Sequence, residues 1–570
     1  MSPNKSTGSY YTPEILSDFL VSHIFRKYVN KNAISILEPS CGDGQFIASL
    51  FAKNAIHLNA DIDIELIDIN KSELEKANKL IPSGVKYNSV TQDYLERFIN
   101  GQAKYSLIIG NPPYIKKSHL QEKQIDRCEE VHQMMKEYNS IVTSNAKIKN
   151  IWPAFIEANI MSLTDDGILC LVIPAEILQV KYAQELRALI ADEFDRVEVF
   201  AFNELIFEGI QQDVIALIGV KGVIDTNEHG FSFYQVDSLE DLKEPKFTEK
   251  HSNIHRTTLD KWTNYILTDQ ELNFVDNLKN QYSSVKSFCQ NAEVGIVTAA
   301  NDYFILSEKD LNDNKLKSSK SLIKPILPKG YFVSNICEFS EEDYELLKLR
   351  NVKVNFIHFP DVPQNKFGKS AQSYLQKGEE LELHLRYKMK KRNNWYHVPG
   401  VWLAEGLFIK RSHRFPKMFV NTANVFATDS FYRIVTKEEF DIKNLVFSFY
   451  NSLTFILAEL EGRYYGGGVL ELTPNEFKGL VVPYNRNITD DQFATLDRML
   501  RSSTPIEQIL TFTNAILFEE VDVKRLESIR TKLVNRRLKK LAQNGIFDSI
   551  NINELDQNSD FNKKKASEVL

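Results

Sequence analysis

Short apolar runs alternate with amphipathic segments from Ala33 to about Val220, and this alternation constrains the fold more than any other feature. The strand-like runs are AISILEP, IELIDI, VKYNSV, YSLIIG, GILCLVIP, RVEVFAF and DVIALIGV, whereas KSELEKANKL and AEILQVKYAQELRALIADEF are expected to be helices. The alternation predicts right-handed crossovers and an α/β fold with a mostly parallel sheet. Ligands of such sheets bind outside the carboxyl ends of the strands. The turns after Pro39, Asp68 and Gly110 are therefore expected on one rim.

The chain of 570 residues is too long for one ordinary domain. The polar stretch EDLKEPKFTEKHSNIHRTT predicts a boundary between a first domain, residues 1–245, and an α+β domain, residues 246–485. Residues 486–550 are expected to be helical, with an apolar stripe of Leu526, Ile529, Leu533 and Leu541 among basic residues, and residues 551–570 to be disordered. A second polar stretch, residues 115–151, is either a surface insertion or a mobile lid over the rim.

The composition limits the partners. With a net charge of -7, a nucleic-acid partner requires basic residues gathered in one place. The five cysteines are far apart and form no CxxC motif, which argues against a disulfide framework and against a zinc or other metal site. This cysteine pattern suits a reducing cytoplasm. No run of 18 apolar residues is present, so no transmembrane helix and no membrane partner are expected.

The first strand ends in the turn ILEPSCGDGQFI. Gly42 and Gly44 allow a tight turn that a ligand can approach closely, and Glu38 can bind a cationic or hydrogen-bond-donating group. The spacing differs from the GxGxxG that binds a pyrophosphate, and the acidic Asp43 would repel phosphate, so a dinucleotide is disfavoured.

Carboxylates also follow the next two strands. Asp68 lies where a ribose hydroxyl would bind, and Asp93 can accept a hydrogen bond from an exocyclic amine. Taken singly, each acid is more often a helix cap or a solvated loop residue. Acids at three consecutive strand ends together predict a site for a neutral to cationic nucleoside.

These motifs resemble the S-adenosylmethionine site of class I methyltransferases, specifically of amino-methyltransferases that act on DNA. LEPSCGDGQF resembles motif I, Asp68 and Asp93 match motifs II and III, and GSYYTPEILSDFLV resembles motif X. Thr12 and Pro13 of motif X also suit a helix start with proline in its first turn. The resemblance implies a Rossmann-like methyltransferase fold with S-adenosylmethionine as the cofactor. The cofactor-binding residues that it implies are Thr12, Pro13, Glu38, Pro39, Cys41, Gly42, Asp43, Gly44, Asp68 and Asp93.

The fourth strand ends in Asn111, Pro112, Pro113 and Tyr114, a tetrapeptide expected by chance about 10⁻³ times in such a chain. An adenine N6 amine is a poor nucleophile, because its lone pair is delocalised into the ring. The Asn111 side-chain oxygen and the Pro112 carbonyl, preorganised by the prolines, can accept its two hydrogens and localise that lone pair. We expect Tyr114 to be exposed and to stack on a base swung out of the duplex.

ELIFEGIQQDVIAL resembles motif VIII, in which Phe207 either closes the other face of the base or is simply a core residue. The motif order resembles the gamma class of N6-adenine DNA methyltransferases, in which target recognition follows the catalytic domain. The resemblance covers about residues 8–222 with specific motifs and is looser beyond them. It assigns catalysis to residues 1–245 and target recognition to residues 246–485.

Two basic segments are candidate DNA contacts. RYKMKKRNNWYH contains no acid and IKRSHRFPK is also basic, and both include aromatic residues. Each run alone also suits a solvated face. The predicted DNA-binding residues are Arg386, Lys388, Lys390, Lys391, Arg392, Lys410, Arg411 and Arg414.

The resemblance implies double-stranded DNA as the substrate, methylated at adenine N6 in a restriction-modification system. A cognate endonuclease would be encoded separately, and the sequence does not reveal whether one exists. Three alternatives stay open: an RNA adenine methyltransferase, a protein glutamine methyltransferase, and a catalytically inactive DNA-binding specificity subunit. The intact tetrapeptide from Asn111 argues against the last. A monomer and a dimer are both compatible with the sequence, which does not reveal the DNA site.

Overall fold

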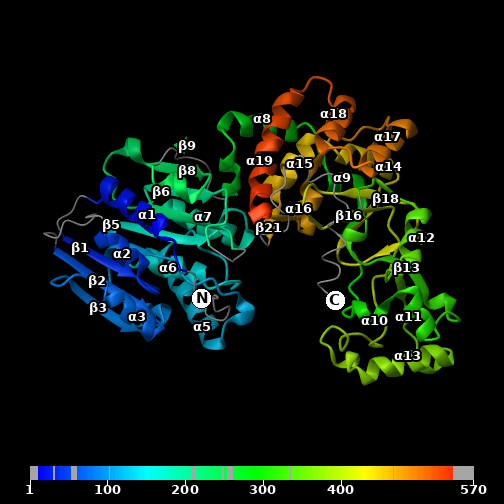
Figure 1. Cartoon of the computed structure of the whole chain (residues 1–570), viewed down its shortest axis with the longest axis horizontal. Helices are drawn as coiled ribbons and strands as arrows, with labels where there is room; N and C mark the ends of the chain where they lie inside the picture. The colour runs from blue at the N-terminus through cyan, green and yellow to red at the C-terminus, as the bar shows by residue number, and fades with distance from the viewer. Residues whose placement is uncertain are drawn as a thin grey trace. The chain divides into compact units, whose positions relative to one another are not determined.

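The computed structural model describes residues 11–29, 33–52, 61–101, 103–207, 212–244, 249–252, 261–333, 335–465 and 468–543. These residues form two compact units (Figure 1), a first unit built mainly from Met1–Leu272 and a second built mainly from Asn273–Leu538. Three expectations stay predictions: the boundary after residue 245, the separate helical region from residue 486, and the assignment of catalysis to the first domain and target recognition to the second. The disorder expected for residues 551–570 falls outside the described residues.

A nine-stranded sheet forms the centre of the first unit, with the order β3-β2-β1-β4-β5-β7-β6-β8-β9. The strands β3, β2, β1, β4 and β5 are parallel, whereas β7 runs antiparallel between β5 and β6. The strand bounds are β1 (Ala33–Glu38), β2 (Asp61–Asp68), β3 (Lys86–Thr91), β4 (Tyr105–Gly110), β5 (Leu163–Pro174), β6 (Arg196–Phe202), β7 (Val214–Val220), β8 (Gly230–Val236) and β9 (Glu249–Ser252). The predicted α/β fold with a mostly parallel sheet is confirmed, and the ends of β1, β2 and β4 share one rim.

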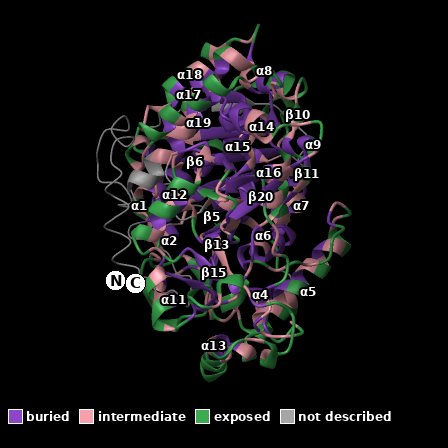
Figure 2. Ribbon diagram, turned by 90° about the vertical axis from the view of Figure 1, so that its right-hand side faces the viewer, coloured by how far each residue is buried: buried purple, intermediate pink, exposed green. Residues whose placement is uncertain are grey.

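Helices connect these strands. They are α1 (Glu14–Lys27), α2 (Gln45–Ala52), α3 (Lys71–Asn78), α4 (Tyr94–Asn100), α5 (Glu122–Tyr138), α6 (Trp152–Met161) and α7 (Gln184–Glu193). Strands β6 and β7 are buried at every residue. The sequence of β7 is accordingly a continuous apolar run, whereas β6 also buries Arg196 and Glu198. Figure 2 shows β5 and β6 among the buried residues.

Two expectations for helices in this unit differ from the structure. The stretch AEILQVKYAQELRALIADEF is not one helix: two 3₁₀ turns, η2 (Ala175–Leu178) and η3 (Lys181–Ala183), precede α7. The buried Arg187 Nη1 donates to the carbonyls of Ile177 and Val180, at 2.8 and 3.1 Å, and thereby satisfies backbone groups of the broken segment. The polar stretch after the tetrapeptide contains α5, which packs through the buried Cys128, Val131 and Met135.

The second unit mixes small sheets with helices, as expected for an α+β region. Its larger sheets have the orders β11-β20-β16-β18-β14, β12-β15-β13-β19 and β17-β22-β21. The strand bounds are β10 (Ser283–Ser284), β11 (Cys289–Val294), β12 (Ile305–Leu306), β13 (Ile323–Leu327), β14 (Glu338–Phe339), β15 (Asn355–Ile357), β16 (Gly406–Ile409), β17 (Arg411–Ser412), β18 (Met418–Asn421), β19 (Phe426–Ala427), β20 (Phe431–Thr436), β21 (Arg463–Tyr465), β22 (Val469–Glu471) and β23 (Val481–Val482).

The longer helices of this part of the chain surround those sheets, and α8 begins at the border of the two units. They are α8 (Asp269–Lys279), α11 (Glu308–Asp313), α12 (Glu341–Leu349), α13 (Lys369–Glu380), α14 (Ile442–Phe449), α15 (Ser452–Glu461), α16 (Pro474–Gly479), α17 (Asp490–Arg501), α18 (Ile506–Leu517) and α19 (Val523–Gln543). The one-turn helices α9 (Val285–Phe288) and α10 (Asn301–Phe304) complete the set.

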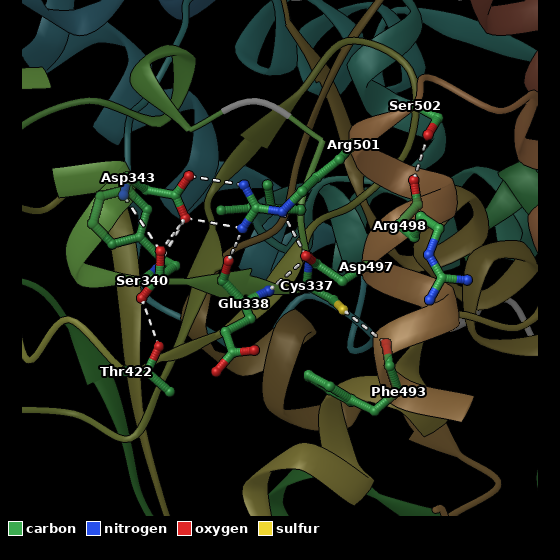
Figure 3. A network of polar contacts seen from close by, with 12 residues as sticks. Cys337, Glu338, Ser340, Asp343, Thr422, Phe493, Asp497, Arg498, Arg501 and Ser502 are labelled. Atoms are coloured by element: carbon green, nitrogen blue, oxygen red, sulfur yellow. Dashed lines mark hydrogen bonds and ion pairs between the residues drawn. The ribbon is translucent and has the colours of Figure 1, made fainter. Parts of the chain in front are cut away.

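A polar network joins α17 to the start of α12 (Figure 3). The Arg501 guanidinium donates to both carboxylate oxygens of Asp343, at 2.8 and 2.9 Å, and to the Glu338 carbonyl. Asp497 accepts from the Arg501 Nε and from the Cys337 backbone amide. One arginine therefore connects two helices and a strand that lie far apart in the sequence.

Helix α19 carries the predicted apolar stripe, because Leu526, Ile529 and Leu533 are buried. The Leu541 side chain lies outside the described residues. Arg530, Arg536 and Arg537 of the same helix are also buried, so part of its basic character faces inward. No helix in the described part of the chain is long and apolar enough to cross a membrane.

Candidate cofactor and catalytic site

The turn after β1 is shaped by its glycines. Gly42 and Gly44 have φ angles of +52° and +86°, which other residues rarely adopt. A Cβ on Gly44 would lie 2.7 Å from the Ala77 Cα, so glycine also lets α2 begin close against α3. The Gly42 amide donates to Asp68 Oδ2 at 2.9 Å, and the Asn70 amide donates to Asp68 Oδ1 at 2.7 Å. Asp68 thus joins the ends of β1 and β2.

Glu38 is the most deeply buried acid of this turn, with 1% of its surface exposed. Its Oε2 atom has no hydrogen-bond partner among the described residues. Burial, with the nearby Asp68 and Asp43, raises the pKa of Glu38 well above its usual range. A buried acceptor without a partner beside two more carboxylates fits a ligand that brings a cationic donor group. The turn therefore fits the ammonium end expected for the cofactor.

The neighbours of Glu38 have different roles. Burial raises the pKa of Asp43 and that of Asp68. Cys41 is buried, and burial together with Glu38 raises the pKa of its thiol, so it is a packed neutral group. Pro39 packs close to β4, because a Cβ on Gly110 would lie 3.4 Å from the Pro39 Cδ.

Asp93 begins α4 and is held on both carboxylate oxygens. Oδ1 accepts from the Leu95 amide at 2.9 Å, which caps the helix, and Oδ2 accepts from Arg127 Nη1 at 2.9 Å. Asp93 therefore caps helix α4, which was the simpler interpretation of this residue from the sequence. Each carboxylate oxygen has a further lone pair, so the cap does not exclude a hydrogen bond from a ligand.

Asn111 follows β4 and is held from three sides. Its Nδ2 donates to Thr12 Oγ1 at 3.2 Å, and its backbone carbonyl accepts from Ser40 Oγ at 3.1 Å. The Tyr114 hydroxyl lies 2.5 Å from Asn111 Oδ1 and 2.8 Å from the Val172 carbonyl on β5. The structure thus brings motif X, the turn after β1 and the tetrapeptide together.

Two expectations for this site were wrong. Tyr114 is not exposed, because only 7% of its surface is accessible and its hydroxyl binds β5 and Asn111. Thr12 makes no cap: Pro13 occupies the N-cap position of α1 without a side-chain cap bond, and Thr12 binds Asn111. Pro112 is buried, Pro113 is half-buried and Phe207 is buried, with 5% of its surface exposed. The choice between base contact and core for Phe207 stays open.

The predicted DNA-binding residues divide into two kinds. Arg386, Lys388, Lys390 and Lys391 are exposed. Arg392 is half-buried and donates to backbone carbonyls, and its contact with phosphate stays a prediction. Its Nη2 donates to the Thr298 carbonyl at 2.8 Å and its Nη1 to the Trp395 carbonyl at 3.1 Å, while burial lowers the pKa of its guanidinium.

The second basic segment lies beside the β17-β22-β21 sheet. Lys410 Nζ and Arg411 Nε lie 3.1 and 2.5 Å from the two carboxylate oxygens of Glu471. Arg414 is half-buried, and its carbonyl accepts from Arg537 Nη2 at 2.6 Å. Arg537 in turn pairs with Glu459 at 2.8 Å, so a buried cation supports the loop that carries Arg414.

Sequence reasoning missed two residues of the site. Ser40 binds the Asn111 carbonyl, and Arg127 binds Asp93. Both contacts join positions far apart in the chain, and only the order of strands on the rim hinted at the first. Among the described residues, no group of three or more His, Cys, Asp or Glu side chains is arranged to hold a metal ion.

Comparisons with known proteins show what this chain is similar to. The family "Eco57I restriction-modification methylase" matches residues 33–207, and "Type II methyltransferase M.Eco57I, C-terminal domain" matches residues 259–518. Type II methyltransferase M.AccI of Acinetobacter calcoaceticus is 25% identical, covering 84% of this chain and 86% of its own. M.BanIII of Aneurinibacillus aneurinilyticus is 22% identical, covering 76% and 82%. The solved structure of the type IIG restriction endonuclease BpuSI aligns with a TM-score of 0.43 and 14% identity, over 94% of this chain and 66% of that chain.

The two family matches lie on the two parts of the chain that carry the site and the basic segments. The likeness to M.AccI and M.BanIII extends over most of the chain. S-adenosylmethionine is the cofactor that these matches imply. The chain belongs to the type II restriction-modification DNA methyltransferases of the gamma class.

Proposed function

We propose that this protein methylates the N6 amine of an adenine that is flipped out of a specific site in duplex DNA. The modification protects DNA in a restriction-modification system whose endonuclease is a separate protein. One observation carries the proposal: the Asn111 amide is fixed between Thr12 and Tyr114 at the end of β4, beside the turn with the unpartnered Glu38 oxygen.

The held amide explains how a weak nucleophile can be activated. Because Asn111 Nδ2 donates to Thr12, its Oδ1 points to the other side of the amide, where the Tyr114 hydroxyl lies. A carbonyl oxygen has two lone pairs, so Oδ1 can also accept from the target amine. The Pro112 carbonyl is proposed as the second acceptor. Two fixed acceptors draw the amine nitrogen towards tetrahedral geometry and localise its lone pair for in-line attack.

Acidic residues at three strand ends are proposed to bind three different parts of the cofactor. Glu38 is proposed to bind the ammonium group, Asp68 the ribose hydroxyls and Asp93 the adenine amine. Gly42 and Gly44 allow the backbone to approach the ligand, since they carry no Cβ. When bound, S-adenosylmethionine supplies the activated methyl group. No side chain with a tuned pKa is required as a base, because the amine loses its proton after methylation.

The aromatic residues are proposed to form the pocket for the flipped base. The Tyr114 ring is one wall and Phe207 the other, while the Tyr114 hydroxyl has the further role of orienting the Asn111 amide. The exposed cations Arg386, Lys388, Lys390 and Lys391 are proposed to contact phosphates, together with Lys410, Arg411 and Arg414.

The test is to incubate the purified protein with labelled S-adenosylmethionine and duplex DNA and to identify the methylated nucleosides by mass spectrometry. We expect N6-methyldeoxyadenosine, and sequencing of the modified DNA would give the recognition site. Methylation of cytosine alone, or of RNA or protein in place of DNA, would contradict the proposal. Asn111→Ala should abolish most of the product. Asn88→Ala, which removes an amide bound to Glu65 outside the site, is the matched control.

A further inference from the structure

A tyrosine in the second unit is exposed on a turn that is otherwise firmly held. The turn comprises Lys329–Phe332, separated from β13 by Pro328, and Gly330–Phe332 within it form the 3₁₀ turn η8. Half of the Tyr331 surface, 51%, is accessible. The Tyr331 and Phe332 ring centroids are 4.2 Å apart, and Lys329 Nζ lies 5.6 Å from the Tyr331 centroid. We call these four residues the aromatic turn.

The backbone of the aromatic turn is fixed from both sides. The carbonyl of Pro328, just before it, accepts from Thr428 Oγ1 at 2.7 Å and from Ser430 Oγ at 3.3 Å. The next residue after the turn, Val333, is buried and donates its amide to the Gly330 carbonyl at 3.1 Å. The Tyr331 ring is therefore presented on a fixed backbone.

Gly330 shows how closely this turn approaches the strand that precedes the second basic segment. A Cβ at Gly330 would lie 2.7 Å from the Ile409 Cγ2. The next residue, Lys410, donates its amide to the Ser430 carbonyl at 3.1 Å. Lys417 Nζ binds Asn335 Oδ1 at 2.7 Å, a few residues beyond the turn. The aromatic turn and the basic segment thus belong to one connected surface.

The charge around Tyr331 suits a polyanion. Lys329, Lys410, Arg411 and Lys417 are the cations of this surface. Two of them, Lys410 and Arg411, share Glu471, and the exposed Asp429 lies in the neighbouring turn, whereas Lys329 is exposed beside the Tyr331 ring. An exposed aromatic ring beside a lysine, on a turn that packs against the strand leading into a basic segment, is a combination that can bind nucleic-acid bases and phosphates together, whereas a protein-docking patch is usually apolar over a larger area.

We propose that Tyr331 contacts bases of the bound DNA by stacking, with Lys329 on an adjacent phosphate. This inference rests on the proposed function, because it takes duplex DNA as the substrate. A ring on a fixed turn loses little backbone entropy on binding, so more of its stacking energy remains to offset the cost of opening a base step. Tyr331 would then act in target recognition, away from the methylated base.

The test compares Tyr331→Ala, Tyr331→Phe and Lys329→Gln in the full chain. The probe is a fluorescein-labelled duplex that carries the site methylated by the wild-type protein, and binding is measured by anisotropy over a series of salt concentrations. Tyr331→Ala should bind about tenfold more weakly with an unchanged salt slope, because it removes a stacking ring and no cation. Tyr331→Phe should bind like the wild type. Lys329→Gln should reduce the salt slope by about one.

Controls separate this inference from the proposed function and from misfolding. Tyr87→Ala removes an exposed ring, 45% accessible, from β3 of the first unit and should leave binding unchanged. Cofactor affinity should be the same in every variant. If Tyr331→Ala binds as tightly as the wild type, or if Tyr331→Phe is as weak as Tyr331→Ala, base stacking by Tyr331 is wrong. If the wild type neither binds nor methylates duplex DNA, the proposed function fails instead.

A second readout reports on the DNA itself. Permanganate oxidises thymines that are unstacked, so a thymine beside the contacted step should become reactive in the wild-type complex and in Tyr331→Phe. The reactivity should disappear with Tyr331→Ala at protein concentrations that saturate the duplex. Reactivity that persists in the saturated Tyr331→Ala complex would overturn the assignment.

Discussion

Arg127 holds Asp93 across the rim of the first unit: its Nη1 lies 2.9 Å from Asp93 Oδ2, and its Nη2 lies 2.9 Å from Glu96 Oε1. Arg127 is part of α5, in the segment that follows the tetrapeptide Asn111–Tyr114. His132 of the same helix binds the buried Glu157 of α6 at 2.7 Å. The residues after Tyr114 are therefore connected directly to the carboxylate proposed to bind the cofactor's adenine.

This ion pair gives the first prediction. Arg127→Met removes the cation but keeps much of the aliphatic packing, so Asp93 should be less well positioned and cofactor affinity should fall by up to about tenfold. Calorimetric titration with S-adenosylmethionine measures the change. Arg97→Met is the matched control, because it removes an arginine paired with Glu65 at the far end of α4. Equal affinities in wild type and Arg127→Met would limit α5 to a structural role.

The second prediction concerns Asp68. Asp68→Ala should weaken cofactor binding by about 1–3 kcal/mol, the range for a hydrogen bond to a charged group. The structure adds that the melting temperature should fall, because the Gly42 and Asn70 amides lose their acceptor. Unchanged cofactor affinity in calorimetry would remove Asp68 from the site, whatever happens to the melting temperature.

Glu198 on β6 gives the third prediction, which concerns acid stability. Its buried carboxylate accepts from Lys27 Nζ and the Tyr28 hydroxyl, both at 2.6 Å, and lies 2.7 Å from His23 Nε2. Burial alone would raise the pKa of Glu198, but His23 and Lys27 lower it to about 2. The pKa of Glu198 is therefore lower in the folded protein than the ordinary value for glutamate in an unfolded chain, about 4.3. The ionised carboxylate stabilises the fold fully above that pH, and the stabilisation is lost as the pH falls through about 2.

Glu198→Gln should therefore lower the unfolding free energy of the first unit at neutral pH by about 3–5 kcal/mol, because the cations around it lose their buried partner. The difference from the wild type should shrink as the pH falls from about 4 to about 2, in thermal melts at each pH. Glu75→Gln changes an exposed glutamate and serves as the control. A constant difference at every pH would show that Glu198 stabilises the fold through packing alone.

The fold of the first unit was largely predictable, and the reason is local. Strands such as β1, β4, β5 and β7 are largely apolar runs bounded by turn residues, and the parallel pairing of β1, β2 and β4 places their carboxyl ends on one rim. The short turns η2 and η3 were not predictable, because Arg187 stabilises them from ten residues away. Helix α5 was missed although its buried Cys128, Val131 and Met135 recur at intervals of three and four residues, because most of the residues between them are polar or charged.

The sequence allowed the residues of the candidate site to be predicted better than the hydrogen bonds between them. The sequence places Asn111, Glu38, Asp68 and Asp93 at strand ends, but it does not show that Thr12 binds the Asn111 amide. A run of cations does not reveal which member turns inward, and Arg392 binds backbone carbonyls while its neighbour Lys390 is exposed.

This distinction leads to the fourth prediction. Changing Lys388, Lys390 and Lys391 together to glutamate should weaken duplex binding and reduce the salt slope, by about 0.9 for each phosphate that is no longer neutralised. Cofactor affinity should stay the same. Arg392→Glu should instead lower the melting temperature, because the carbonyls of Thr298 and Trp395 lose their donor. A triple variant with the wild-type salt slope would make this run only a solvated surface.

The last prediction separates the role of the Tyr114 ring from the role of its hydroxyl. Asn111→Ala should bind DNA and cofactor normally and lose about 10²–10³-fold in single-turnover methylation, because the amide oxygen matters most in the transition state. Tyr114→Phe keeps the ring and removes the hydroxyl that reaches Asn111 and Val172, so it should also slow methyl transfer while base flipping, reported by 2-aminopurine fluorescence, stays normal. Tyr114→Ala should lose flipping as well, since stacking contributes about 1–3 kcal/mol per base. If Tyr114→Phe methylates at the wild-type rate, the hydroxyl does not orient the amide, and Thr12 alone positions Asn111 for catalysis.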